Sequence, residues 1–553
     1  MVASFNGFFS FLQSLLAFII ILVPLVVFHE LGHFIFAKIF RVKAQIFSVG
    51  FGPKLWSRQK GETEFRISMI PMGGYVKLLG EDRDTELSEE EARRSLHRQE
   101  PWKRFFIFFG GPLFNFILAV FIFMVILLIG EPQISSVIGR VVRYSAAEKI
   151  GFQSGDRVLS VNQKPLKKFE EILIIVNQNP DKKVDFEVIH PGQQKSVHLE
   201  VQISSQSGFS LYGESTRVGE ISGILPMPRS TVVGVSDPKS SVALHGIETG
   251  DQVVELDQHP VFHWEEMEKI YSGVLPGSTF KVQVKSPKVA QIKLFLLTKP
   301  QRASNLGDDF GLHSSELFVE KTIAKSPAEG SGILPGDRLV SVGKQKVESF
   351  FELKDAVQKS GEKEGKVLLT WEHQGKMVSK PMVPTATSMR DPILNKTTQF
   401  TVGIIPKLIL SEPETFVERI WNPFKLVYTA TDRMVSFSWR NLISLRKMLT
   451  GEVSVGTIGG PIMIGKIAGE SLARGLIVFL NNMAIFSIGL GVLNILPVPV
   501  LDGGHLMLLG IEMVRGKPLT LRQMEVIQSV GLILILALMG IAFHNDIARL
   551  FYS

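Results

Sequence analysis

The sequence predicts a polytopic α-helical membrane protein with four transmembrane helices, a membrane-associated β hairpin and a mixed α/β block outside the bilayer. Four segments without Lys, Arg, Asp or Glu predict the helices: 2–28, 105–130, 475–501 and 526–543. The shortest has 18 residues and the longest 27, and about 20 apolar residues suffice to cross a bilayer. The polar interval from 131 to 474 contains an internal repeat, which indicates folded domains rather than a linker.

Composition excludes several classes of protein. Of 553 residues, 45% are apolar and 20% are charged, which fits neither a wholly soluble nor a disordered chain. The formal charge of +7 comes from 60 basic and 53 acidic residues, and we expect no nucleic-acid partner. Because the chain has no cysteine, it forms neither disulfides nor thiolate metal sites.

The distribution of basic residues predicts the orientation in the membrane. Thirteen Lys and Arg lie between Phe40 and Arg104, and the positive-inside rule keeps such a loop in the cytoplasm. With four spans, the loop 506–525 is then also cytoplasmic, and the block 131–474 lies outside. The first span lacks a positive n-region and a small-residue cleavage site, so we expect it to remain as a helix.

Two further segments have a clear local pattern. Within the cytoplasmic loop 40–104, residues 44–56 and 64–79 have strand character and are bounded by Gly-rich turns, which predicts a hairpin lying against the membrane. From Pro413 to Leu449, aromatic and aliphatic residues recur at three- and four-residue steps. That pattern predicts an amphipathic helix, suited either to the membrane surface or to ordinary packing against other helices.

A motif with the form Gly-x-x-x-Gly-Asp occurs three times, at 151–156, 246–251 and 332–337. Each copy precedes an alternating apolar stretch and then a helical pattern. The glycines permit a tight turn, and the Asp is expected to accept hydrogen bonds from nearby amides. The copies resemble PDZ domains, which bind extended peptides by adding them to a sheet edge. Each copy is therefore expected either to bind peptide or to act as a spacer.

The strongest chemical signal is His29-Glu30-Leu31-Gly32-His33 in the first predicted helix. Positions i and i+4 share one helix face, so both imidazoles can reach one metal ion. The intervening Glu can take a proton from metal-bound water, as in metalloproteases. Ionisable groups in an apolar helix are costly unless they are paired or bound to metal, which favours a functional site over two core histidines.

A catalytic zinc site commonly takes three protein ligands, so a third is needed at the same membrane depth. Topology brings the end of the third span to that side, where the chain reads Asn494-Ile-Leu-Pro497-Val-Pro499-Val-Leu-Asp502-Gly-Gly-His505. Two prolines disfavour a regular helix, and such backbone is tolerated at membrane depth only inside protein or around a watery cavity. We predict Asp502 as the third ligand, with His505 as its rival.

These segments resemble the site-2 protease family of intramembrane zinc metalloproteases, and more closely its bacterial branch of the RseP type. Further matches are Gly50-Phe-Gly-Pro53, Pro71-Met-Gly-Gly-Tyr75, Gly111-Pro-Leu-Phe-Asn115 and Gly459-Gly-Pro-Ile462. That branch usually carries two PDZ domains, whereas this chain shows three copies. The uncharged segments, the repeats and the local patterns together predict the following organisation: helix 1 at 1–39, loop 40–104, helix 2 at 105–130, PDZ-like domains at 131–210, 211–302 and 303–388, an amphipathic region at 389–474, helix 3 at 475–505, loop 506–525 and helix 4 at 526–545.

The resemblance implies that His29, His33 and Asp502 bind Zn²⁺ and that Glu30 is the general base. A transmembrane substrate must unwind before cleavage, and its amides then need partners, which we expect the 44–79 hairpin to supply. Asn494, Pro497 and Pro499 are predicted to contact substrate. Two roles are open for Asn115, namely substrate contact and hydrogen bonding between helices.

The resemblance also predicts partners and location. Expected substrates are single-span membrane proteins, of the anti-sigma factor or remnant signal peptide type, cleaved in regulated intramembrane proteolysis. The outer domains would admit them only after another protease has removed the external part. The expected location is the bacterial inner membrane, with the active site toward the cytoplasm and the PDZ-like domains in the periplasm. Two alternatives are a PDZ-bearing membrane scaffold with an inactive site and a metal transporter.

Overall fold

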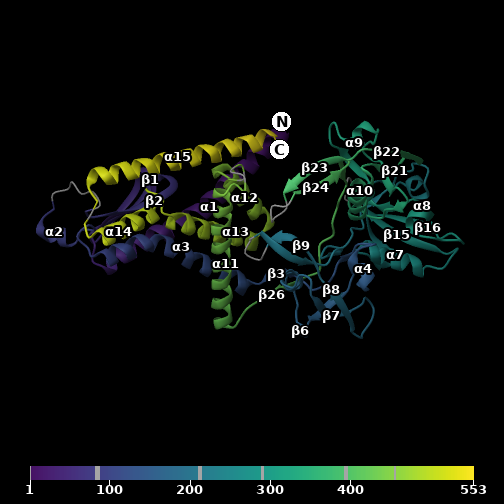
Figure 1. Cartoon of the computed structure of the whole chain (residues 1–553), viewed down its shortest axis with the longest axis horizontal. Coiled ribbons are helices and arrows are strands. Elements are labelled where there is room, and N and C mark those ends of the chain that lie inside the picture. The colour runs from purple at the N-terminus through teal and green to yellow at the C-terminus, as the bar shows by residue number, and fades with distance from the viewer. Residues whose placement is uncertain are drawn as a thin grey trace. The chain divides into compact units, whose positions relative to one another are not determined.

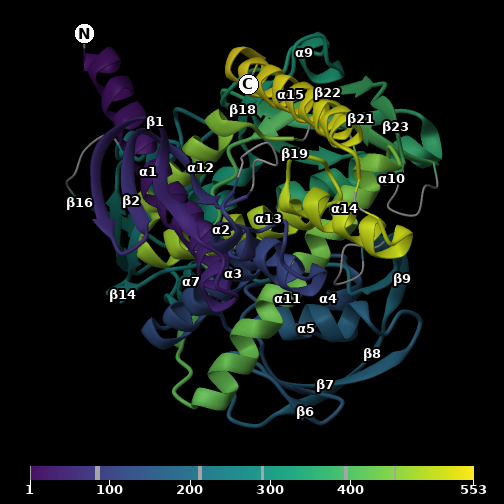
Figure 2. The same cartoon turned by 90° about the vertical axis from the view of Figure 1, so that its left-hand side faces the viewer.

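The computed structural model describes residues 2–80, 87–209, 215–287, 292–390, 396–453, 456, 458–517 and 519–552 (Figures 1 and 2). Residues 81–86 of the predicted cytoplasmic loop, and the predicted boundary between the first two repeats at 210 and 211, lie outside these ranges. The chain divides into two compact units. Unit 1 comprises Met1–Glu131 and Val417–Ser553, and unit 2 comprises Pro132–Phe416.

Among the described residues, four helices, all in unit 1, are long and apolar enough to cross a membrane, and they coincide with the four predicted spans. The candidate spans are Leu12–Ile39, Pro101–Ile129, Leu476–Ile495 and Arg522–Arg549. They lie in α1 (Val2–Ile39), α3 (Pro101–Ile129), α13 (Leu476–Ile495) and α15 (Leu521–Tyr552). Helix α3 begins four residues before the uncharged segment, because Pro101 suits the first helical turn and Arg104 pairs with Glu512.

Helix α3 is the centre of unit 1, since it packs against α1, α11, α13 and α14 (Figure 1). Helices α1 and α3 approach closely at two glycines. A Cβ atom at Gly32 would lie 2.0 Å from the carbonyl oxygen of Gly110, and one at Gly110 would lie 2.7 Å from the carbonyl oxygen of Gly32. Small residues allow such close backbone contact between membrane helices. The remaining helices of unit 1 are α2 (Glu89–Arg93), α11 (Pro423–Leu449), α12 (Pro461–Arg474) and α14 (Asp502–Arg515).

The predicted interruption after the third span is present. Helix α13 ends at Ile495, and the two prolines lie in the non-helical segment 496–501. Helix α14 then begins at Asp502. A Cβ atom at Gly503 would lie 2.1 Å from the carbonyl oxygen of Leu496, so the chain can turn this tightly only with glycine at that position.

The predicted hairpin is formed by β1 (Ala44–Lys60) and β2 (Thr63–Leu78), which pair antiparallel. Residues 46–49 of β1 face 64–67 of β2 on one side and 74–77 on the other. The hairpin therefore folds back on itself, with the start of β1 between the two halves of β2. The second half of β2 is then an outer strand, and β2 also packs on α1.

The amphipathic helix is shorter than predicted. Helix α11 begins at Pro423, where the Asn422 side chain accepts hydrogen bonds from two backbone amides, and residues 415–418 form the strand β26 instead. The prediction of a helix from Pro413 was therefore wrong for residues 413–422. The Asn422 cap and Pro423 set the position where the helix starts. In Figure 1, α11 runs across the direction of α3 and α15. It buries Leu426 and leaves Phe424 86% exposed.

Unit 2 contains three four-stranded sheets with one common strand order, and each carries one copy of the repeated motif. The sheets are β6-β5-β7-β8, β14-β13-β15-β16 and β20-β19-β21-β22. Their central strands, β5 (Arg157–Val161), β13 (Gln252–Leu256) and β19 (Arg338–Val342), each follow a Gly-Asp pair. The helix after each motif is α5 (Phe169–Asn177), α7 (Trp264–Gly273) or α10 (Phe350–Glu364).

The other strands of these sheets are β6 (Lys164–Pro165), β7 (Lys183–Ile189), β8 (Val197–Gln202), β14 (His259–Pro260), β15 (Thr279–Lys285), β16 (Ile292–Thr298), β20 (Gln345–Lys346), β21 (Val367–His373) and β22 (Lys376–Met382). Further strands are β3 (Glu131–Ile134), β4 (Arg140–Val141), β9 (Ser204–Phe209), β10 (Ser215–Glu220), β11 (Ile224–Leu225), β12 (Val233–Gly234), β17 (His313–Ser314), β18 (Val319–Thr322), β23 (Thr385–Arg390), β24 (Lys396–Thr401), β25 (Ile404–Pro406) and β26 (Thr415–Glu418). Short helices are α4 (Ala146–Ile150), α6 (Ser241–Leu244), α8 (Leu306–Phe310), α9 (Pro327–Gly330) and the 3₁₀ turn η1 (Ser315–Leu317).

The three motif aspartates make the predicted hydrogen bonds. Asp156, Asp251 and Asp337 are buried, and each carboxylate accepts a hydrogen bond from the backbone amide three residues earlier, at 2.9 Å. Each Asp therefore closes the turn that leads into its central strand. This repeated contact explains why the motif keeps its spacing in all three copies.

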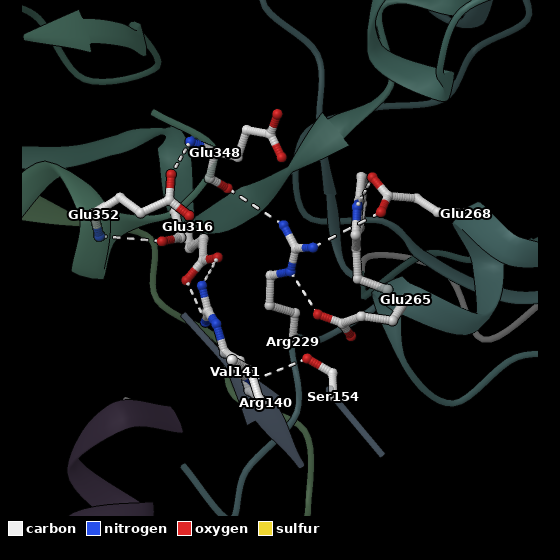
Figure 3. A network of polar contacts seen from close by, with 11 residues as sticks. Arg140, Val141, Ser154, Arg229, Glu265, Glu268, Glu316, Glu348 and Glu352 are labelled. Carbon is white, nitrogen blue, oxygen red and sulfur yellow. Dashed lines mark hydrogen bonds and ion pairs between the residues drawn. The ribbon is translucent and has the colours of Figure 1, made fainter. Parts of the chain in front are cut away.

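One buried ion pair and one hydrogen bond to a backbone carbonyl join the repeats within unit 2 (Figure 3). Arg140 of the first repeat donates two hydrogen bonds, of 2.9 and 3.1 Å, to Glu316 of the third, and both side chains are buried. Arg229 of the second repeat donates to Glu265 at 2.8 Å and to the Glu348 carbonyl oxygen at 3.4 Å. The Arg140–Glu316 pair is costly to break by changing one partner, because the remaining charge stays buried.

Arg140→Met is expected to lower the free energy of unfolding of unit 2 by about 3–5 kcal/mol, because Glu316 would remain charged and unpaired. The double variant Arg140→Met/Glu316→Leu should recover most of this loss. Pulse proteolysis of the full chain across a urea series measures both. The matched control is Arg157→Met, whose partner Glu414 is half exposed, and which should cost about 1 kcal/mol or less. A single variant as stable as this control would contradict the expectation.

Candidate metal centre

Three side chains from opposite ends of the sequence converge in unit 1. His29 and His33 lie one turn apart on α1, with their Nε2 atoms 3.3 Å apart. Asp502, at the start of α14, lies with Oδ2 3.1 Å from His29 Nε2 and Oδ1 3.4 Å from His33 Nε2. Among the described residues, this is the one group of three or more potential metal ligands whose ligand atoms lie within 4.8 Å of one another.

Glycine on α3 makes room for the two imidazoles. A Cβ atom at Gly111 would lie 2.4 Å from His33 Nε2 and 2.7 Å from His29 Cε1. The backbone of α3 therefore forms one wall of the site. The sequence analysis includes Gly111 in a family motif but assigns it no role at the site, although the Gly110-Gly111-Pro112 run inside an apolar helix is a signal for close packing.

Each imidazole is also held through its Nδ1 atom. His33 Nδ1 lies 2.8 Å from the Ile107 carbonyl oxygen, and His29 Nδ1 lies 3.0 Å from Asn115 Nδ2. Both rings thereby direct Nε2 toward Asp502. Contacts of this kind orient the ligands of metal sites in general. Asn494 also reaches the site, with Nδ2 3.5 Å from His29 Nε2.

The rival ligand His505 has a different environment. Its ring stacks on Phe108, with ring centroids 4.8 Å apart and an interplanar angle of 8°. Among the described residues, His505 does not belong to the cluster of potential ligands. The geometry therefore places Asp502, and not His505, beside the two histidines.

Glu30 lies beneath the outer strand of the hairpin. A Cβ atom at Gly74 would lie 3.1 Å from Glu30 Cγ and 3.0 Å from Val26 Cγ1, so this strand passes directly over α1. The Phe51 ring covers the neighbouring Gly73 and stacks on Tyr75, with ring centroids 6.2 Å apart. The hairpin and the histidine motif thus form one local arrangement.

The cluster fits a zinc ion by its chemistry. Two imidazoles and one carboxylate form the donor set of many catalytic zinc sites. Asp502 Oδ2 is buried and accepts no hydrogen bond, which leaves its lone pairs free for a cation. A buried carboxylate oxygen that accepts no hydrogen bond is costly in a protein interior, and a bound cation removes that cost.

Unit 2 has a separate cavity of about 290 Å³ between the second and third repeats. Helix α7 contributes Trp264, Glu268 and Tyr271, and the third repeat contributes Arg338 and Lys346. Burial and the nearby Arg338 lower the pKa of His313 in this cavity to about 3, so the imidazole is neutral at physiological pH. Most of the side chains that line this cavity are polar or charged, with Trp264 and Tyr271 among the aromatic ones.

A helical membrane unit with a His-Glu-x-x-His helix and a converging carboxylate defines a membrane metalloprotease. The chain belongs to peptidase family M50, whose family model matches residues 17–538. It is an intramembrane zinc metalloprotease of the site-2 protease type. The predicted enzyme class is thereby confirmed, and the comparisons give no support to the scaffold or the transporter.

Relatives match over nearly the whole chain. "Regulator of sigma-E protease RseP" of Escherichia coli K12 and its namesake of Salmonella typhimurium are each 28% identical, covering 98% of this chain and 100% of the relative. A Neisseria meningitidis protein named "Putative zinc metalloprotease NMA0084" is 30% identical with the same coverage. Among solved structures, a PDZ domain protein from Parabacteroides distasonis covers 50% of this chain and 99% of that protein at 11% identity, but its TM-score of 0.12 supports no argument.

Gly111→Ala is expected to abolish zinc binding, because the new methyl group would overlap His33 Nε2. Zinc content of the purified protein, measured by elemental mass spectrometry, checks this. Gly489→Ala on α13 is the matched control, since its Cβ would meet no atom within 4 Å. Equal zinc content in both variants would show that α3 does not form a wall of the site.

Proposed function

We propose that His29, His33 and Asp502 hold the zinc ion and that Glu30 is the general base for hydrolysis of peptide bonds in or next to transmembrane segments. The observation that supports this most is the convergence of Asp502 on the two histidines across more than 460 residues of chain. Zinc bound there would polarise the scissile carbonyl and lower the pKa of a bound water.

Glu30 is the residue that would move the proton. It lies between the two histidines in sequence and does not share their helix face, so it is free to take a proton from the attacking water. The same carboxyl group would then deliver the proton to the leaving amine. The backbone of Val76 hydrogen-bonds to Glu30, which holds the carboxylate beside the hairpin.

The hairpin would hold the substrate as an extended strand. A transmembrane helix hides its carbonyls in its own hydrogen bonds, and an unwound segment needs new partners away from water. Among the described strands, the outer half of β2, residues 74–78, pairs with β1, and it passes over Glu30. A substrate strand added to its other side would run past the proposed zinc site.

Asn494, Pro497 and Pro499 would line the opposite side of the substrate path. The amide of Asn494 reaches the side of His29 that faces Asp502, where it can donate to the substrate backbone or to the developing oxyanion. The prolines lie in the non-helical segment 496–501, directly before Asp502, and they keep that backbone from forming a regular helix. Substrate contact by Asn115 stays a prediction, because its side chain is buried against His29.

Substrates would be single-span membrane proteins of the anti-sigma factor or remnant signal peptide type. Two relatives carry the name "Regulator of sigma-E protease RseP", and this name supports substrates of the anti-sigma factor type. The basic loops support an active site toward the cytoplasm and repeats on the periplasmic side of a bacterial inner membrane. The repeats would bind extended peptides, and the cavity beside α7 is a candidate position.

Glu30→Gln is expected to reduce cleavage of a model single-span substrate by about 10²–10⁴-fold, because the amide cannot accept the proton. Zinc content should be unchanged, since Glu30 is not a proposed ligand. Cleavage assays in detergent with the purified full chain, with and without chelator, provide the measurement. Cleavage at the wild-type rate would remove Glu30 from the mechanism.

Ligand identity has its own test. His33→Ala and Asp502→Asn are expected to lose most of the bound zinc, whereas His505→Ala should retain it, because the His505 ring stacks on Phe108 away from the cluster. Elemental analysis of each purified variant needs no knowledge of the substrate. If His505→Ala lost zinc and Asp502→Asn kept it, the third ligand would be reassigned.

A further inference from the structure

Asn115 is a fully buried polar residue in the apolar helix α3, and its contacts are unusual. Its Nδ2 atom lies 3.0 Å from His29 Nδ1, and its Oδ1 atom is buried without a hydrogen-bond partner. Its backbone carbonyl accepts a hydrogen bond of 2.8 Å from Ser487 on α13. The side chain is therefore directed entirely at one of the two proposed imidazole ligands.

The chemistry of imidazole limits what Asn115 can do there. A neutral imidazole has one nitrogen that carries hydrogen and one that has a free lone pair. His29 Nε2 faces Asp502 and His33, so a metal ion held by Nε2 requires the hydrogen on Nδ1. That N–H needs an acceptor, and the amide nitrogen of Asn115 cannot accept.

Rotation of the amide by 180° supplies the acceptor. It exchanges Oδ1 and Nδ2 without changing the shape of the side chain, and amide orientation is set by the hydrogen bonds that it makes. Because Oδ1 makes no hydrogen bond in its present position, the rotation breaks none there. The rotated oxygen would then accept a hydrogen bond from His29 Nδ1.

The two histidines differ in how they are held. His33 Nδ1 faces the carbonyl oxygen of Ile107, which is always an acceptor and fixes the tautomer with Nδ1 protonated. His29 depends on a side chain that can donate or accept. Asn115 is therefore the one described residue whose side chain can select the His29 tautomer through Nδ1.

We propose that Asn115 is a positioning residue that accepts a hydrogen bond from His29 Nδ1 and so keeps Nε2 free to bind zinc. This inference rests on the proposed function, because it requires His29 to be a metal ligand. An amide suits the task inside a membrane helix, since it accepts a hydrogen bond without carrying a charge.

Three variants of the full chain separate this role from simple packing. Asn115→Leu has nearly the same shape but no acceptor, and its zinc affinity should fall about 10–100-fold. Asn115→Asp restores an acceptor at the same place and should bind zinc within about tenfold of wild type. Ser487→Ala removes the neighbouring hydrogen bond to the Asn115 backbone without changing the His29 contact, and its affinity should be unchanged.

Zinc affinity is measured by competition with a chromogenic chelator on detergent-purified protein, and the melting temperature of each variant reports on folding. Wild-type affinity in Asn115→Leu would overturn the inference, as would equal losses in the Leu and Asp variants. If Asn115→Leu does not fold, Asn115→Ala takes its place with the same expectation. A wild-type protein that binds no zinc would overturn the proposed function itself, whereas zinc-loaded wild type with unaffected variants would overturn only the role of Asn115.

Discussion

The contact between the Asp502 carboxylate and the imidazoles of His29 and His33 is the interaction on which the rest of unit 1 depends. It joins the first candidate span to the start of α14, just after the third span, where ionisable groups are costly unless they are paired. Each of the three side chains lowers the free-energy cost of placing the other two among apolar helices. The surrounding features, from the glycines of α3 to the break after α13, allow these three side chains to meet.

The membrane environment explains why each departure from regular structure occurs where it does. The non-helical segment 496–501 lies against helices of the same unit, with Pro499 packed on Gly531 of α15. Backbone that is not helical is tolerated at membrane depth only when protein surrounds it or water fills a cavity beside it. The same reasoning applies to the folded-back hairpin, whose outer strand passes over Glu30. Two irregular features of the described part of unit 1, the segment 496–501 and the folded-back hairpin, thus lie beside the His-Glu-x-x-His motif.

Much of the site was predictable because each of its two motifs is local in sequence. The spacing of His29 and His33 follows from one helical turn, and Asp502 was the acidic residue nearest the end of the third span. Contacts that depend on packing were not predictable in this way. That Asn115 meets His29 follows only from the approach of α1 and α3 at Gly32 and Gly110. In the same way, Arg140 pairs with Glu316, which lies 176 positions later in the sequence. The start of α11 was placed too early because apolar periodicity was given more weight than Asn422 and Pro423.

The most direct test uses the absence of cysteine from the natural chain. In an Asp502→Cys variant loaded with zinc, X-ray absorption spectroscopy should show one sulfur at about 2.3 Å from the metal, added to nitrogen neighbours at about 2.0–2.1 Å. Because the introduced side chain would supply the one thiol in the protein, a sulfur at that thiolate distance can come from no other cysteine. A His505→Cys variant should show nitrogen and oxygen neighbours only. Two results would contradict the claim that Asp502 meets the two histidines at the metal. One is a zinc spectrum of the Asp502→Cys variant without a sulfur neighbour, and the other is a spectrum of the His505→Cys variant with one.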